Sequence, residues 1–148
     1  MPSELIHVNA LICEKTLQEG DFILSAIRIA DMFRARIDHS VPPKSRAPIV
    51  FFLITSARFI GTPESHRVTV DVVRVSGEVA PLQGEVLVPA PHNIEYPDAP
   101  HGFNLVSQCV IVPANLGTAY LSVSIDGKNV ARVPFTIADI ADAQQEHP

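Results

Sequence analysis

The chain has 148 residues, of which 47% are hydrophobic and 18% are charged, and its formal net charge at pH 7 is -5. These totals fit one globular domain that buries roughly 70% of its unfolded surface, and they exclude a disordered chain and a fibrous repeat. Because Asp139, Asp142 and Glu146 supply part of the negative charge, the body of the chain is nearly neutral and no nucleic-acid partner is expected.

The apolar segments are too short to cross a membrane. The longest uncharged apolar run, at 47–57, falls well below the ~20 residues that a spanning helix needs. Near the start of the chain, Glu4 stands where a secretory signal has positive charge, and His7 and Asn9 interrupt the apolar stretch. The sequence therefore predicts a cytoplasmic protein with no membrane partner.

Two cysteines, Cys13 and Cys109, each lie within an apolar run. A free thiol in such a position behaves as a small hydrophobic group, so we expect both to be buried and reduced. A disulfide that joins two strands is the alternative.

Alternating apolar residues and frequent β-branched side chains predict strands throughout, and almost no long window has the spacing of a helix. We predict an all-β fold: a single two-layer antiparallel β-sandwich of seven to nine strands, immunoglobulin-like in general form. It covers residues 1–137, and an acidic C-terminal tail at 138–148 is disordered or forms a short helix. The expected strands are 5–13, 22–33, 48–59, 66–76, 83–89, 103–113, 119–126 and 129–137.

The faces of these strands follow from the alternation. The apolar residues at even positions from Ile6 to Ile12 share one face of the first strand. Segment 49–55 is apolar on both faces, so its second face needs a cover, either a loop of the same chain or another subunit. Within 68–75 the apolar pattern changes face midway, which predicts a bulge near Val72.

Two long proline-rich loops, at 36–48 and 89–102, interrupt the strands. Proline fixes φ and lacks an amide donor, so these segments run over the surface and are candidates for binding. The first loop has a mildly basic rim that can take an acidic partner or the chain's own acidic tail, unless it is only solvated. The rim consists of Arg34, Arg36, Lys44 and Arg46.

The second loop carries residue types that bind metal ions, spaced three residues apart. On the extended path that prolines favour, successive members are about 9 Å apart, whereas ligands of one ion lie within about 4 Å of each other. We therefore expect no metal site, because a shared ion needs a loop that folds back. The four weak candidates are His92, Glu95, Asp98 and His101.

No stretch carries a catalytic motif. There is no G-x-S-x-G elbow, and the seven glycines form no phosphate-binding loop. We expect His39 and His66 to be solvated near loops. The sequence thus predicts no catalytic residues, no cofactor and no enzymatic activity.

The closing segment, YLSVSIDGKNVARVPFTI at 120–137, predicts a hairpin. Its apolar residues are odd-numbered on both strands, and opposed residues share a face, so the loop needs an odd number of residues. We predict a three-residue loop at 127–129 with Asn129 in the left-handed region, rather than a ligand site at Asp126. Pro134 predicts a sheet edge or a local irregularity.

The opening ALICEKTLQEGDFILSAIRIADMF, the valine-rich centre and this closing hairpin together resemble a family of small bacterial β-sandwich proteins classed only as a domain of unknown function. The resemblance covers roughly residues 8–137, and its motifs are the Cys13-Glu14 pair, the Gly20-Asp21 bend and the Asp126-Gly127 tip. It implies a β-sandwich and supplies no catalytic residues.

Together these features predict a non-catalytic binding module that uses its loops and a sheet edge. We expect a protein partner, with a second copy of the chain among the candidates. The alternatives are a structural subunit of a larger assembly and, with less support, a metal-dependent hydrolase built on the second loop.

Overall fold

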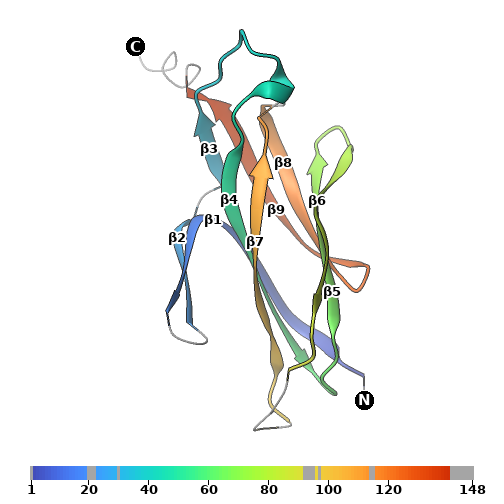
Figure 1. The fold of residues 1–148 in the computed structure, drawn as a ribbon. Helices are drawn as coiled ribbons and strands as arrows, with labels where there is room; N and C mark the ends of the chain where they lie inside the picture. Colours follow the sequence, from blue (N-terminus) through green and yellow to red (C-terminus); the bar gives the residue numbers. More distant parts are fainter. Residues whose placement is uncertain are drawn as a thin grey trace.

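A computed structural model of the chain describes residues 2–19, 23–29, 31–91, 96, 98–113 and 116–140. Within these residues nine strands form two sheets that pack face to face, as Figure 1 shows. The predicted all-β, two-layer sandwich is therefore confirmed.

Each sheet combines strands that are distant in the sequence. The first has the order β2-β1-β4-β7, with β1 (Glu4–Glu19), β2 (Ile23–Ile29), β4 (Ile49–Ile60) and β7 (His101–Ile111). The second has the order β3-β9-β8-β5-β6, with β3 (Met32–Ala35), β5 (His66–Arg74), β6 (Val79–Val88), β8 (Gly117–Ile125) and β9 (Lys128–Asp139). A single 3-10 turn, η1 (Pro43–Ser45), lies in the first proline-rich loop of the described chain.

The core lies between the two sheets, where every second side chain of the inner strands points inward. Phe51 of β4 is fully buried and stacks on Phe33 of β3, with ring centroids 4.6 Å apart. Leu121 and Val123 of β8 are also fully buried. Each such side chain contributes about 1.5–3 kcal/mol by leaving water.

The predicted strand at 22–33 is wrong, because this segment forms two strands in different sheets. β2 pairs antiparallel with β1, whereas β3 pairs parallel with β9, from Met32 beside Thr136 onward. The backbone amide of Thr136 also donates to the carbonyl of Asp31, 2.8 Å away. Apolar residues recur throughout 22–33, so the sequence gives no sign that the chain passes from the first sheet to the second within this segment.

The first strand departs from simple alternation at Ile6. The pairing of β1 with β4 shifts register between Leu5 and His7, so Leu5 packs against the core and Ile6 remains 47% exposed. Ala10 and Ile12 face the core as predicted.

The bulge predicted near Val72 is also wrong. β5 pairs with β8 in unbroken register from Val68 to Arg74. The irregularities lie in its pairing with β6, where Val70 opposes Gln83 and the next residue opposes Pro81. In both irregularities the extra residue, the one without a counterpart on the other strand, lies in β6. The apolar pattern of β5 changes because valines also lie on the outer face of the sheet.

The hairpin between β8 and β9 corrects the predicted three-residue loop. Asp126 and Gly127 form a two-residue turn, with φ of 52° and 79°, and Ile125 pairs directly with Lys128. This is the geometry that Asp-Gly favours in tight hairpins. Ser124 pairs with Asn129 and Val123 pairs with Ala131, so Val130 forms a bulge in β9. Beyond this bulge the odd-numbered apolar residues of the two strands oppose each other and share one face.

β9 is an inner strand, but β3 pairs with it only from Thr136 onward. No other described strand pairs with β9 on that side at Pro134. β9 continues to Asp139, beyond the expected domain boundary at 137. Residues 141–148 of the expected tail lie outside the described residues.

Candidate functional site

Two of the four predicted metal candidates, Asp98 and His101, lie among the described residues. His92 and Glu95 lie outside the described residues, Asp98 is exposed, and His101 is half-buried near Phe59. Elsewhere in the described chain, no three His, Cys, Asp or Glu side chains are grouped so that they could hold a metal ion.

The two cysteines lie on opposite faces of the first sheet. Cys13 pairs with Phe52, and Cys109 pairs with Phe51, on either side of β4. Strands two places apart are separated by about 9.6 Å, beyond the ~7 Å that a disulfide spans between Cα atoms. Both thiols are buried and not joined in a disulfide, and burial raises the pKa of Cys109 to about 11. Neither is suited to nucleophilic chemistry.

His66 is the buried histidine that the sequence analysis expected to be solvated. It is 6% exposed, and its ring stacks flat on Phe59 with centroids 4.0 Å apart. Its Nδ1 donates to Asp126 Oδ2 at 2.7 Å, and its Nε2 lies 3.3 Å from Ser3 Oγ. No local pattern predicts this contact, because its members come from three distant segments.

Asp126 joins the β8-β9 turn to the start of β5. Besides the contact with His66, its Oδ1 accepts from the backbone amide of Arg67 at 2.9 Å. Desolvation opposes ionisation, but hydrogen bonds from His66 and from the Arg67 amide prevail and lower the pKa of Asp126. Serine, histidine and aspartate follow the order of a nucleophilic triad, yet here the imidazole is buried and the carboxylate is half exposed. The arrangement serves as a structural link.

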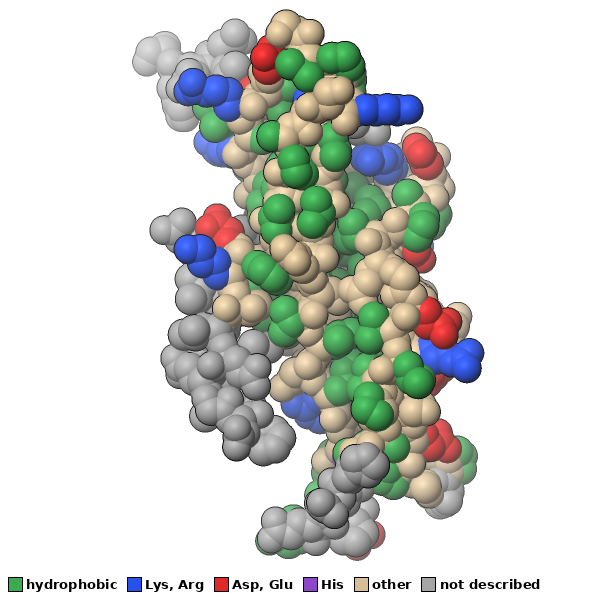
Figure 2. Space-filling model, in the orientation of Figure 1, with side chains coloured by type: hydrophobic (Ala, Val, Ile, Leu, Met, Phe, Trp, Pro, Cys, Tyr) green, Lys and Arg blue, Asp and Glu red, His purple; other side chains and the backbone are tan. Residues whose placement is uncertain are grey.

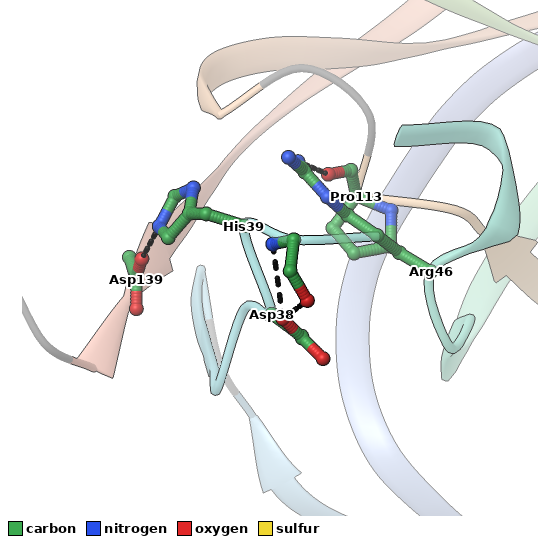
Figure 3. A network of polar contacts seen from close by, with 6 residues as sticks. Asp38, His39, Arg46, Pro113 and Asp139 are labelled. Carbon is green, nitrogen blue, oxygen red and sulfur yellow. Dashed lines mark hydrogen bonds and ion pairs between the residues drawn. The ribbon is translucent and has the colours of Figure 1, made fainter. Parts of the chain in front are cut away.

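The first proline-rich loop is held at both ends, as Figure 3 shows. His39 Nε2 contacts Asp139 Oδ2 at 2.7 Å, which ties the loop to the end of β9. Arg46 Nη1 donates to the carbonyl of Pro113 at 2.9 Å, just beyond β7. Of the four basic rim residues, only Arg46 is half-buried, whereas Arg34, Arg36 and Lys44 are exposed.

This loop borders a half-open cavity of about 310 Å³ against the first residues of β4. Its walls are mostly apolar, and its polar groups are two arginines, a serine and an aspartate. The lining residues are Ala35, Arg36, Ile37, Asp38, Val41, Ser45, Arg46, Ala47, Pro48, Ile49 and Pro113.

The outer face of the first sheet is apolar over β4 and β7, and Figure 2 shows the hydrophobic side chains gathered along it. Val50 pairs with Val110, and Ile54 pairs with Val106. Ile54 is buried, but Val50 is 47%, Val106 37% and Val110 51% exposed. Segment 49–55 is therefore only partly covered within the described chain.

β7 forms one edge of this sheet and has no strand partner beyond β4 in the described residues. Its sequence, HGFNLVSQCVI, contains no proline and no lysine, arginine, aspartate or glutamate. Among the described residues, the outer edge of this 11-residue strand is therefore not protected by charge or proline, and it lies beside the exposed valines.

No family model matches this chain, and no match was found among curated proteins or solved structures. The resemblance to the bacterial sandwich family therefore stays a prediction. The part of the chain that the structure describes includes no helix long and apolar enough to span a membrane.

Proposed function

We propose that this chain is a non-catalytic binding module that accepts an extended polypeptide strand along the edge of β7. The observation that carries the proposal is the free, uncharged and proline-free edge of β7. Such an edge binds a further strand through main-chain hydrogen bonds, and side-chain contacts then select the partner.

The other described edges are protected in ways that β7 is not. β3 has only four residues and carries Arg34. β6 contains Pro81 and Glu85, and its pairing is irregular at two points. β2 has only seven residues, whereas β7 has 11. Charges, prolines, bulges and short length are the devices that prevent edge pairing.

The face beside the edge supports the same proposal. Val106 and Val110 point outward from β7, beside Ile54 and Val50 of β4 respectively. A strand added to β7 places every second side chain on this face, where apolar groups can cover the valines. The buried area then adds about 25 cal/mol per Å² to the main-chain hydrogen bonds.

A second copy of the chain is the partner that fits this edge best. An antiparallel pair of β7 strands centred on Val106 places Val106 opposite its counterpart and Asn104 opposite Gln108. The same register places Gly102 opposite Val110. No like charges oppose each other, and two four-stranded sheets join into one.

Sedimentation velocity tests the proposal. We expect the wild-type chain to form a dimer at micromolar concentration and Val106→Lys to form a monomer, because the substitution places two ammonium groups opposite each other at the two-fold axis. Val75→Lys is the matched control, since Val75 is 76% exposed and lies just after β5 in the other sheet.

If the wild-type chain is a monomer at high micromolar concentration, the second copy is excluded as partner. Titration with a synthetic peptide of residues 101–111 then tests strand addition itself. A chain that neither dimerises nor binds this peptide is not a strand-accepting module.

A further inference from the structure

We propose that the cavity beside the first proline-rich loop binds a small organic carboxylate with an apolar body. This site is separate from the β7 edge and does not rest on the function proposed above. Its polar lining consists of Arg36, Asp38, Ser45 and Arg46, and its apolar lining includes Ile37, Val41 and Ile49.

Arg46 supplies the main argument. Its guanidinium is half-buried, its Nη1 donates to the Pro113 carbonyl, and its Nε is buried with no hydrogen-bond partner. No carboxylate of the described chain forms an ion pair with it. A partly buried cation without a counter-ion is unfavourable, so an anion that binds there removes this cost.

One nitrogen of the guanidinium is left for an anion. Nη1 is engaged by Pro113 and Nε is closed off from the surface, so Nη2 is the remaining donor. Its N–H groups can donate to the oxygens of a carboxylate. Arg36, exposed at the same cavity, provides a second positive charge.

Asp38 also lines the cavity, but its carboxylate is engaged elsewhere. Its Oδ1 accepts from the backbone amide of Ser40 at 3.0 Å and from the Ser40 hydroxyl at 2.5 Å. These hydrogen bonds lower the pKa of Asp38. In Figure 3 the carboxylate points away from the guanidinium of Arg46. Two arginines against one aspartate leave the cavity with a net positive charge.

The size and walls of the cavity define the rest of the ligand. A volume of about 310 Å³ is at the lower end of ligand pockets, which span roughly 300–1,000 Å³. The apolar walls favour a ligand with a hydrocarbon body over a bare inorganic anion. The contacts of His39 with Asp139 and of Arg46 with Pro113 hold the loop in place, so little ordering is needed on binding.

Isothermal titration calorimetry with hexanoate tests this inference. We expect saturable binding of one hexanoate per chain, and at least tenfold weaker binding of acetate, inorganic phosphate and hexan-1-ol. Arg46→Gln should weaken hexanoate binding at least tenfold. Arg34→Gln is the matched control, because Arg34 is exposed on β3 and does not line the cavity.

A second variant keeps the test independent of the fold around Arg46. Ala47 is exposed and lines the cavity, so Ala47→Phe fills the space without removing a charge. We expect this variant to lose hexanoate binding while its thermal unfolding is unchanged. The proposal is overturned by any one of three results. These are no binding of hexanoate by the wild-type chain, equal binding of phosphate and hexanoate, or full hexanoate binding by both Arg46→Gln and Ala47→Phe.

Discussion

At the scale of single residues, Asp126 has the most demanding position among the described residues. It is the one non-glycine residue there with a positive φ, and its carboxylate receives hydrogen bonds from His66 and from the amide of Arg67. The turn conformation and the two hydrogen bonds therefore depend on one side chain. Asparagine tolerates the same φ but lacks the charge.

We expect Asp126→Asn to lower the free energy of unfolding by roughly 1 kcal/mol at pH 7, a value reduced for partial exposure. Because folding lowers the pKa of Asp126 from 3.8, the carboxylate contributes stability above about pH 4 that is lost as the pH falls through the folded-state pKa. Urea unfolding at pH 7 and pH 3 measures this.

The difference between Asp126→Asn and the wild-type chain should therefore shrink at pH 3. Asp98→Asn is the control, since Asp98 is exposed, and its effect should be small at both pH values. A difference that is equal at pH 7 and pH 3 would show that the charge of Asp126 has no role in the link.

The two thiols should be unreactive in the folded chain. At pH 8 roughly one Cys109 thiol in a thousand is ionised, given a pKa of about 11, and both cysteines are buried. We expect iodoacetamide to modify neither thiol in the native chain and both in 6 M urea, as read by mass spectrometry. A reductant should not change the thermal midpoint, and a reductant-dependent midpoint would point to a disulfide.

At the scale of elements, the close contact between β4 and β7 depends on Gly102. A Cβ at this position would lie 1.8 Å from the carbonyl oxygen of Ala57, far inside any allowed contact. The carbonyl also accepts from Arg58 Nη1 at 2.8 Å, so it is held in place. The start of β7 can therefore pair with β4 only if this residue lacks a side chain.

We expect Gly102→Ala to lower the free energy of unfolding by about 2–3 kcal/mol, because the β4-β7 pairing must separate locally. Gly84→Ala in β6 is the matched control, since a Cβ there meets no atom within 4 Å. Its effect should be neutral or slightly stabilising. Chemical denaturation of both variants measures the difference, and equal effects would contradict the close approach.

The hairpin shows why elements are only partly predictable from sequence. The apolar residues of β8 and β9 are odd-numbered on both strands, and this pattern predicts a three-residue loop. The chain instead combines the two-residue Asp126-Gly127 turn with a bulge at Val130. Both solutions satisfy the same alternation, so parity alone does not distinguish them.

At the scale of the whole molecule, stability depends on the layer between the two sheets. Leu53 of β4 is fully buried there, whereas Val50 of the same strand is half exposed on the outer face. We expect Leu53→Ala to lower the free energy of unfolding by about 2–5 kcal/mol and Val50→Ala by less than about 1 kcal/mol. Similar losses, measured by urea unfolding, would contradict the assignment of the two faces.

The sandwich was predictable because its rule is local: alternate residues are apolar wherever a strand has one face in the core. The candidate cavity was predictable only in part. The basic residues around the first loop were visible in the sequence, but the contact of Arg46 with Pro113 joins residues far apart along the chain. His66 and Asp126 meet in the same way, across 60 positions. Such pairs depend on the order of strands, which alternation does not encode.

The parallel pairing of β3 with β9 sets a condition on how this chain is made. Met32 leaves the ribosome more than a hundred residues before its neighbour Thr136 is added. Until then β3 has no strand to pair with in the second sheet, and loop closure over this span is slow. The nascent polypeptide must therefore complete its second layer only after Thr136 has been synthesised, and before that a chaperone or a premature encounter with another copy can intervene.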